Sequence, residues 1–279
     1  MKCRLCGEEK SLRRSHIIPA FFRDDSGLMY PTGESRNLQP FTQPIHTHPG
    51  KRFDRKQVGY WEKRHGITEH LLCDDCGQYM SRLEDYVKRL FYGDSTPIRF
   101  QLPLLETPLF TADYKKLKLF QLSILWRAAE AKGEFFSAVT VTDFHRARLR
   151  EMLLNRDPGH EDQYCCTLMR LVVSSPEILQ AQRNAGISIE TGCFAPIGEK
   201  HGTWTSYTFV MGGIVWSFCV TCLGVPEIMR NSYVKENGQF WLMPMKADNF
   251  LTNFSRKAVE AGNVTEADAK ESISAKRAV

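Results

Sequence analysis

The sequence predicts an α+β protein in which an N-terminal zinc-bound finger precedes a mixed domain of helices and an antiparallel hairpin. Three patterns support this prediction. Two Cys-x2-Cys pairs bracket the first part of the chain, a helical apolar stripe follows the second pair, and two glycines at 212–213 separate two apolar runs. Cysteine pairs at this spacing are typical of tetrahedral zinc sites, and β-branched and aromatic runs around two glycines are typical of a β-hairpin.

Composition and charge exclude several classes of protein. The chain has 279 residues, of which 42% are hydrophobic and 25% charged, enough to bury the core of one large domain or two modest ones. No run of apolar residues approaches the roughly 18 that a membrane-spanning helix needs, so we expect no membrane partner. The net charge of +5 permits a phosphate-bearing partner without requiring one.

Nine cysteines are present, and their meaning depends on the compartment. The first residues carry no apolar core of a secretory signal, so we expect a cytoplasmic protein whose thiols stay reduced. An odd number of cysteines in that setting favours metal ligands and buried core thiols over disulfides.

The first predicted domain spans residues 1–95. Cys3 and Cys6 lie in a short knuckle, and Cys73 and Cys76 open a helix, in an arrangement like that of a treble clef. All four are predicted ligands of one structural Zn²⁺. Apolar residues recur along the helix at steps of three and four, which places them on one face. The helix is expected over 74–91, and its stripe consists of Tyr79, Met80, Leu83, Tyr86, Val87, Leu90 and Phe91.

A mixed domain is predicted over 96–255. Its helices follow from apolar periodicity, and Asp143 is the expected N-cap of the second one. Alternating and β-branched runs predict its strands. The expected elements are helices at 114–131 and 143–154, strands at 164–173 and 187–194, and a hairpin at 206–211 and 214–220. Residues 256–279 are expected to form a loosely held helix or a tail.

Between the two cysteine pairs the chain carries Ser15-His16-Ile17-Ile18-Pro19, and Leu71-Leu72 precede Cys73. In the order of these motifs, residues 1–92 resemble the zinc-stapled HNH, or His-Me finger, nucleases, and in particular bacterial HNH-like proteins with a Ser-His-Ile-Ile-Pro segment. The Leu-Ser-Ile-Leu-Trp-Arg-Ala run at 122–128 extends the likeness. The resemblance implies a ββα finger of treble-clef type and a metal-dependent endonuclease that hydrolyses phosphodiester bonds, in DNA rather than RNA. It also implies a role in bacterial antiviral defence.

The resemblance implies that His16 is the general base, which suits a side chain with a pKa near neutrality. A divalent cation, Mg²⁺ or Mn²⁺, would stabilise the charge on the leaving oxygen. Related proteins usually carry His, Asn or Glu directly after the last zinc cysteine, where this chain has Gly77, and often Asp where it has Ser15. Either the cation is held elsewhere, or the chain has lost cleavage.

Glu84 is the best substitute ligand for that cation. It lies about two helical turns beyond Gly77, at the edge of the apolar stripe. An unpaired carboxylate there would be costly, so Glu84 is expected either to bind a cation or to pair with a basic side chain. A glutamate that pairs with arginine and has no part in catalysis is the alternative to a cation ligand. His70, Asp74 and Asp75 are further candidates, although the two aspartates also suit the N-terminus of a helix.

A basic loop within the first domain is the predicted binding surface for nucleic acid. Tyr60 and Trp61 interleave with its cations, which are Lys51, Arg52, Arg55, Lys56, Lys63 and Arg64. Cations contact phosphates, and aromatic faces stack on unpaired bases. Arg13 and Arg14 are expected to add to the same surface, and an ordinary solvated loop is the alternative.

Three further questions stay open: whether the chain is catalytically active, what its C-terminal domain binds, and what its remaining cysteines do. Because of Gly77, the chain is alternatively a catalytically inactive, zinc-stabilised module that binds nucleic acid or protein. The C-terminal domain is a candidate surface for a partner protein or a second copy of the chain. Its cysteines are expected to be core thiols, with a second metal site as the alternative; they are Cys165, Cys166, Cys193, Cys219 and Cys222.

Overall fold

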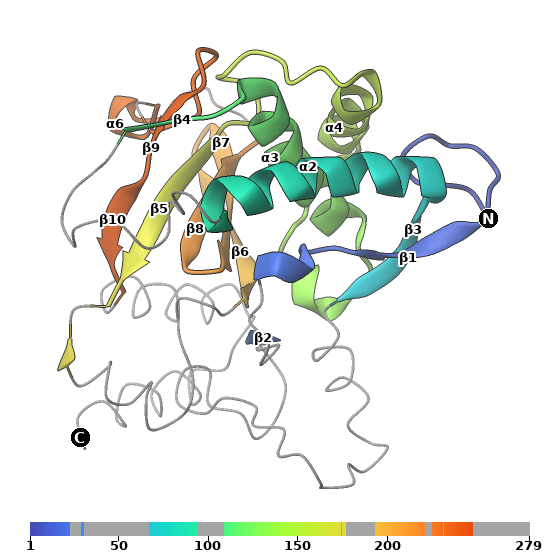
Figure 1. Ribbon diagram of the computed structural model, residues 1–279, viewed down its shortest axis with the longest axis horizontal. Coiled ribbons are helices and arrows are strands. Elements are labelled where there is room, and N and C mark those ends of the chain that lie inside the picture. Colours follow the sequence, from blue (N-terminus) through green and yellow to red (C-terminus); the bar gives the residue numbers. More distant parts are fainter. Residues whose placement is uncertain are drawn as a thin grey trace, which may run out of the picture.

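The computed structural model describes residues 1–22, 29–30, 67–93, 109–173, 175–176, 193–220, 225–230 and 232–247. Over these residues the chain is an α+β protein, as predicted, in which helices pack against one side of a six-stranded sheet (Figure 1). A two-stranded sheet near the N-terminus lies at one end of the first long helix. The basic loop at 51–64 and the tail at 256–279 lie outside the described residues.

The N-terminal part consists of a knuckle, a two-stranded sheet and a helix. Strand β1 (Leu12–His16) pairs antiparallel with β3 (Thr68–Cys73), so that Leu12 lies opposite Cys73 and His16 opposite Thr68. Helix α2 (Asp74–Tyr92) begins directly after β3. The second cysteine pair therefore stands at the junction of strand and helix. A 3₁₀ turn, η1 (Ala20–Phe22), follows β1.

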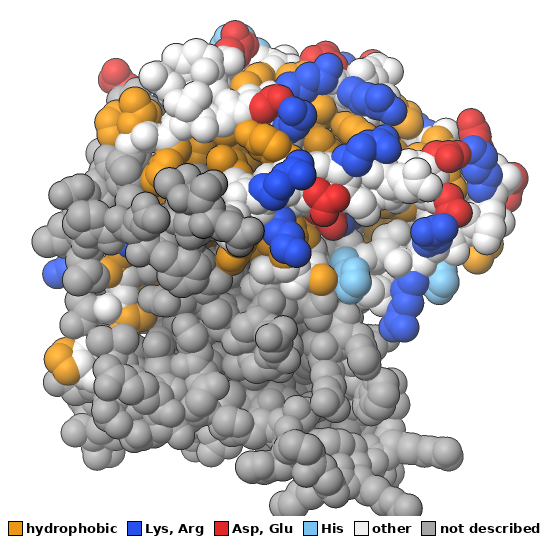
Figure 2. Space-filling view, viewed as in Figure 1, with side chains coloured by type: hydrophobic (Ala, Val, Ile, Leu, Met, Phe, Trp, Pro, Cys, Tyr) orange, Lys and Arg blue, Asp and Glu red, His pale blue; other side chains and the backbone are white. Residues whose placement is uncertain are grey.

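Helix α2 confirms the predicted helix at 74–91 and extends it by one residue. Its buried side chains are Cys76, Met80, Leu83, Val87 and Phe91, which follow the predicted apolar stripe. On its exposed side Arg82, Lys88 and Arg89 are open to solvent. Lysine and arginine side chains gather over α2 and the β1–β3 sheet on the face shown in Figure 2.

Helix α3 (Tyr114–Glu130) is buried along most of its length. Asp113 caps its N-terminus by accepting a hydrogen bond from the Lys116 N–H at 3.0 Å. Every residue from Leu117 to Ala128 is buried, including Lys118, Gln121 and Arg127. Burial on all sides explains why charged side chains in this helix need partners from other elements.

Helix α4 (Asp143–Asn155) lies where a helix was predicted, but its cap differs from the prediction. Thr142, not Asp143, is the N-cap, and its hydroxyl accepts from the His145 N–H. Asp143 is instead the first helical residue, fully exposed and 3.2 Å from Arg146. A threonine in extended conformation occupies the cap position, and the carboxylate next to it interacts with the positive end of the helix.

The main sheet has the order β10-β5-β8-β7-β6-β2. Its strands are β2 (Met29–Tyr30), β5 (Cys166–Val172), β6 (Cys193–His201), β7 (Trp204–Met211), β8 (Ile214–Cys219) and β10 (Met243–Lys246). The central neighbours are antiparallel, whereas the edge strands β2 and β10 run parallel to β6 and β5. Of the strand predicted at 187–194, residues 187–192 lie outside the described residues; β6 begins at Cys193 and continues to His201, beyond the predicted end at Phe194.

The predicted hairpin is confirmed as β7 and β8. Gly212 and Gly213 form its turn with φ values of 59° and 75°. Positive φ at both central residues gives a turn whose twist matches that of the strands. A second small sheet, β4 (Leu109–Thr111) with β9 (Gln239–Trp241), was not predicted. The remaining elements are η3 (Glu134–Phe136) and α6 (Glu227–Arg230).

One aromatic cluster joins the N-terminal and C-terminal parts. The ring centroid of Trp216 on β8 lies 5.5 Å from Phe22, 5.7 Å from Phe91 on α2 and 5.9 Å from Phe120 on α3. Residues from both predicted domains, 1–95 and 96–255, therefore contribute to the same buried core. Among the helices described, none combines the length and apolar character needed to cross a bilayer.

Candidate metal centre and its surroundings

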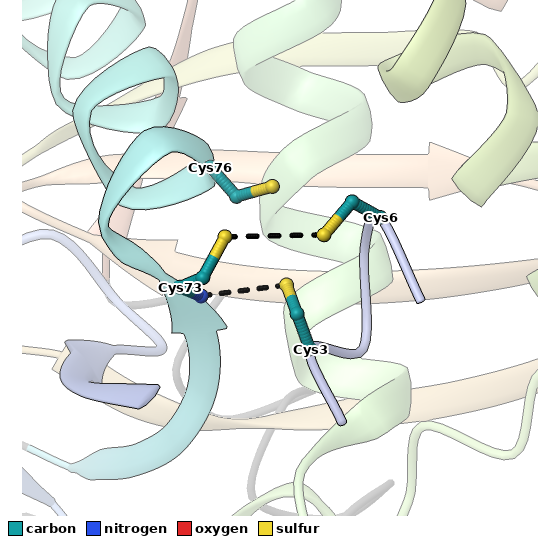
Figure 3. Close-up of side chains that lie close together, drawn as sticks. All are labelled: Cys3, Cys6, Cys73 and Cys76. Atoms are coloured by element: carbon teal, nitrogen blue, oxygen red, sulfur yellow. Dashed lines mark hydrogen bonds between the residues drawn. The ribbon is translucent and has the colours of Figure 1, made fainter. Parts of the chain in front are cut away.

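Four cysteines meet at the junction of the knuckle, β3 and α2 (Figure 3). The sulfurs of Cys3, Cys6, Cys73 and Cys76 all lie within 4.8 Å of one another, and Cys6 Sγ is 3.9 Å from Cys73 Sγ. Zn–S bonds of about 2.3 Å in a tetrahedron place sulfurs about 3.8 Å apart. The cluster can therefore hold a metal ion such as zinc, in agreement with the prediction from the two Cys-x2-Cys pairs.

Backbone groups shape the knuckle around this cluster. The Gly7 N–H donates to the Cys3 carbonyl at 2.9 Å, and the positive φ of Gly7, 81°, allows the tight turn after Cys6. The Cys3 N–H donates to the Glu8 carbonyl at 2.9 Å. In addition, the Cys73 N–H donates to Cys3 Sγ at 3.3 Å. These bonds aim the thiols of the knuckle at those of the helix.

The thiols differ in acidity. Burial raises the pKa of Cys3, but N–H groups of Cys73, Cys6 and Leu5 lower it by more, to about 7. Burial and neighbouring thiols raise the pKa of both Cys6 and Cys76. A divalent cation favours thiolates, so binding of a metal would deprotonate the cluster and release protons.

His16 is the last residue of β1, partly buried, and is followed by the buried residues Ile17 and Ile18. The Ile17 N–H donates to the Ile67 carbonyl at 3.0 Å, which extends the pairing of the two strands. The His16 carbonyl accepts from Nη1 of Arg127 on α3 at 2.7 Å. The backbone of the predicted base, at the end of its strand, is thus tied to a helix residue 111 positions further along the chain.

Glu84 on α2 has a basic partner. Its Oε1 accepts from Arg127 Nη1 at 2.7 Å, and the glutamate side chain is 21% exposed. Of the two alternatives that the sequence left open, a cation or a basic side chain, the structure provides the basic side chain. Since one nitrogen of Arg127 contacts both Glu84 and the His16 carbonyl, it brings these two predicted site residues close together.

Arg127 is a residue whose importance the sequence analysis missed. The sequence did contain an indication: an arginine within an apolar helix is rarely buried without a partner, so its position predicts a buried polar contact. The partner could not be identified, since Arg127 is 43 residues from Glu84 and 111 from His16 in the sequence.

The other candidate ligands have protein partners as well. His70 Nδ1 lies 3.4 Å from the Leu12 carbonyl. Asp74 forms an ion pair with Arg13. Asp75 accepts from Lys10 at 2.9 Å, and this hydrogen bond lowers the pKa of its carboxyl group. Both aspartates lie in the first turn of α2, where their charge complements the helix dipole.

Gly77 occupies open space on α2. A Cβ placed there would meet no atom within 4 Å. Nothing in the surrounding packing therefore requires glycine at this position, although it leaves the helix without a ligand next to Cys76.

Exposed cations lie on two elements of the N-terminal part, β1 and α2. Arg13 and Arg14 on β1 are exposed, as expected, and Arg14 Nε donates to Thr68 Oγ1 at 2.6 Å. Arg82, Lys88 and Arg89 on α2 are also exposed and were not predicted. Together the exposed cations of β1 and α2 form a basic face, and Figure 2 shows lysine and arginine side chains over these elements. The predicted contacts within the loop lie outside the described residues; these are Lys51, Arg52, Arg55, Lys56, Lys63 and Arg64.

The remaining cysteines are core residues where the structure describes them. Cys165, Cys166, Cys193 and Cys219 are at most 1% exposed. In the described part of the chain, no second group of three or more ligating side chains is placed to hold a metal ion. Cys222 lies outside that part. Comparisons of the chain with models of protein families, with curated proteins and with solved structures find no match.

Proposed function

We propose that this chain is a metal-dependent endonuclease of the HNH type, which hydrolyses phosphodiester bonds in nucleic acid, DNA in preference to RNA. One observation carries the proposal. His16, from the Ser-His-Ile-Ile-Pro segment, ends a strand beside the helix that opens with Cys73 and Cys76, and the four cysteines lie close enough for zinc. This order of knuckle, paired strands and helix fits the zinc-stapled finger that the sequence resembles. The same resemblance suggests a role in bacterial defence against phage DNA.

In this proposal His16 takes a proton from a water molecule, which attacks the phosphorus while the bond to the leaving oxygen breaks. Phosphate groups of the substrate bind to the cations on β1 and α2. Arg13, Arg14, Arg82, Lys88 and Arg89 are all exposed to solvent. Zinc in the cysteine cluster would have a structural role, since four thiolate ligands leave no open coordination position for substrate.

The catalytic cation, Mg²⁺ or Mn²⁺, would stabilise negative charge in the transition state. The described residues do not by themselves form its site, since Glu84 Oε1 is engaged by Arg127 and Gly77 offers no ligand. Hard cations of this kind take several oxygen ligands.

A second candidate function follows from the same two observations. Gly77 and the pairing of Glu84 with Arg127 both favour a zinc-stabilised module that binds nucleic acid or protein without cleaving it. In that case the basic face would bind the partner, and His16 would have no part in chemistry.

Nicking of supercoiled plasmid with Mg²⁺ or Mn²⁺ tests the proposal. His16→Ala is expected to slow cleavage by at least about 100-fold, the usual contribution of a general base. His160→Ala, which removes an exposed histidine between α4 and β5, serves as the control and is expected to cleave normally. Both variants should retain zinc. Cleavage that survives His16→Ala would overturn the mechanism, and a wild-type chain inactive with every metal would favour the binding module.

A further inference from the structure

Arg127 has an unusual position for an arginine. Its side chain is only 2% exposed, and each of the three guanidinium nitrogens has a hydrogen-bond partner. Nη1 donates to the His16 carbonyl and to Glu84 Oε1, both at 2.7 Å. Nε donates to the Ser123 carbonyl at 3.3 Å, and Nη2 to Ser123 Oγ at 3.4 Å. One side chain therefore connects β1, α2 and α3.

We infer that Arg127 is a positioning residue for His16, an inference that rests on the proposed function. Arg127 does not touch the reacting atoms. It would act by holding the backbone of the general base at a set distance from α2, with Glu84 as its counter-charge.

Each contact has a distinct part in this arrangement. A buried guanidinium without a carboxylate would be strongly unfavourable, and Glu84 supplies the opposite charge. Ser123, one turn earlier on α3, holds Nε and Nη2 and so leaves Nη1 directed at β1. The planar, fork-like guanidinium can make these bonds at once, which the single ammonium of lysine cannot do.

The end of β1 needs such a support. The strand has only five residues, and among the described residues β3 is its one partner, in a two-stranded sheet. Isolated two-stranded sheets are marginally stable in water. Since a misplacement of about 1 Å can slow an enzyme by about 100-fold, a fixed His16 backbone is valuable for catalysis.

Under this proposal Glu84 acts through Arg127 and not on a catalytic cation. Glu84→Gln separates the two roles, because glutamine keeps an oxygen that can accept from Arg127 but loses the charge that a cation prefers. Because Glu84→Gln also removes the counter-charge of Arg127, we expect a loss of stability together with a loss of less than about tenfold in kcat. The Mn²⁺ concentration that gives half-maximal cleavage should stay unchanged. A large rise in that concentration would assign Glu84 to the cation and overturn its part in the proposal.

Arg127→Met is the main test, with Lys118→Met as its matched control. Lys118 lies on the same helix, is 1% exposed, and donates to the carbonyl groups of Glu161 and Tyr164. Each variant removes one buried cation from α3. We expect Arg127→Met to lower kcat for plasmid nicking by about 100-fold with little change in KM. Lys118→Met should keep kcat within about threefold, and Arg127→Lys should recover part of the loss.

Hydrogen exchange gives a measurement that does not depend on cleavage. The Ile17 N–H, which bonds to the Ile67 carbonyl, should exchange faster in Arg127→Met than in the wild type. In Lys118→Met its exchange should be unchanged. Equal rates at Ile17 in the wild type and Arg127→Met would overturn the proposed support of β1.

The outcomes separate this inference from the proposed function. If the wild type cleaves, His16→Ala does not, and a folded Arg127→Met keeps its kcat, only the positioning role fails. If the wild type is inactive with every metal tested, the nuclease proposal fails and the positioning role fails with it. If Arg127→Met does not fold or does not retain zinc, Arg127→Lys is measured in its place. A kcat and an exchange rate at Ile17 equal to those of the wild type in Arg127→Lys would then overturn the inference.

Discussion

The sulfur of Cys6 lies 3.9 Å from that of Cys73, although 67 residues separate the two in the sequence. This contact brings together two segments that are far apart in the sequence and joins the N-terminal knuckle to the start of α2. Two thiolates at this distance repel each other unless a cation lies between them. The stability of the N-terminal part should therefore depend on a metal ion.

We expect one Zn²⁺ per chain, measured by elemental analysis of the purified protein. Binding to structural zinc sites is worth about 10–16 kcal/mol at pH 7, comparable with the whole stability of a domain at about 5–15 kcal/mol. Cys76→Ser, or a strong chelator, should therefore remove the zinc and unfold the β1–β3 sheet. Cys166→Ala, which alters a buried cysteine outside the cluster, should retain it. A full zinc content in Cys76→Ser would contradict the assignment.

The cations on α2 should contribute to binding of nucleic acid. Arg82→Ala, Lys88→Ala and Arg89→Ala should each weaken binding to DNA of any sequence and reduce the salt dependence of log K by about one. Titrations at several salt concentrations measure this slope. Arg148→Ala on α4, which removes an exposed arginine paired with Glu151 at 2.7 Å, is the control. An equal loss in the control would show that the effect is one of net charge only.

Gly77→Ala should stabilise the protein. A Cβ there meets no atom within 4 Å, and alanine in a helix is more favourable than glycine by about 0.8–1 kcal/mol. Unfolding in urea measures the change. Gly93→Ala is the matched control at the other end of α2, where a Cβ would come within 2.3 Å of the Arg89 carbonyl oxygen, so that variant should be destabilised.

The capping of α3 should give a pH-dependent stability. Burial raises the pKa of Asp113, but its bonds to the Lys116 side chain and N–H lower it by more, so the folded-state pKa lies below the ordinary value of 3.8. The carboxylate therefore stabilises the protein above that ordinary value, and its contribution is lost as the pH falls through the folded-state pKa. Asp113→Ala should cost about 1 kcal/mol at pH 7 and much less in acid below the folded-state pKa.

Thr142→Ala is the control for that measurement. Thr142 caps α4 through a hydroxyl that does not ionise in this range, so its loss should cost the same at both pH values. Urea unfolding of both variants at pH 7 and in acid makes the comparison. A cost for Asp113→Ala that does not change with pH would contradict the expected titration.

Local patterns were sufficient to predict much of the fold. The apolar stripe of α2 and the turn at Gly212 and Gly213 depend on residues that are close together in the sequence. The helix and the hairpin therefore lie where they were predicted. The N-cap of α4 was displaced by one residue, because Thr142 and Asp143 are both good caps and only the backbone conformation distinguishes them. The pairing of β4 with β9 joins residues about 130 apart, and neither three-residue strand has a pattern long enough to predict.

By itself, the sequence determined which cysteines form the candidate metal cluster and which face of α2 is apolar, because spacing and periodicity act along the chain. Only the tertiary structure decided that Arg127 of α3 contacts both Glu84 and the His16 carbonyl. The reason is physical: a buried charge must find its partner wherever packing brings one, and packing joins segments that are remote in sequence. The same packing places Phe22 and Phe91 against Trp216, so that both parts of the chain share one core.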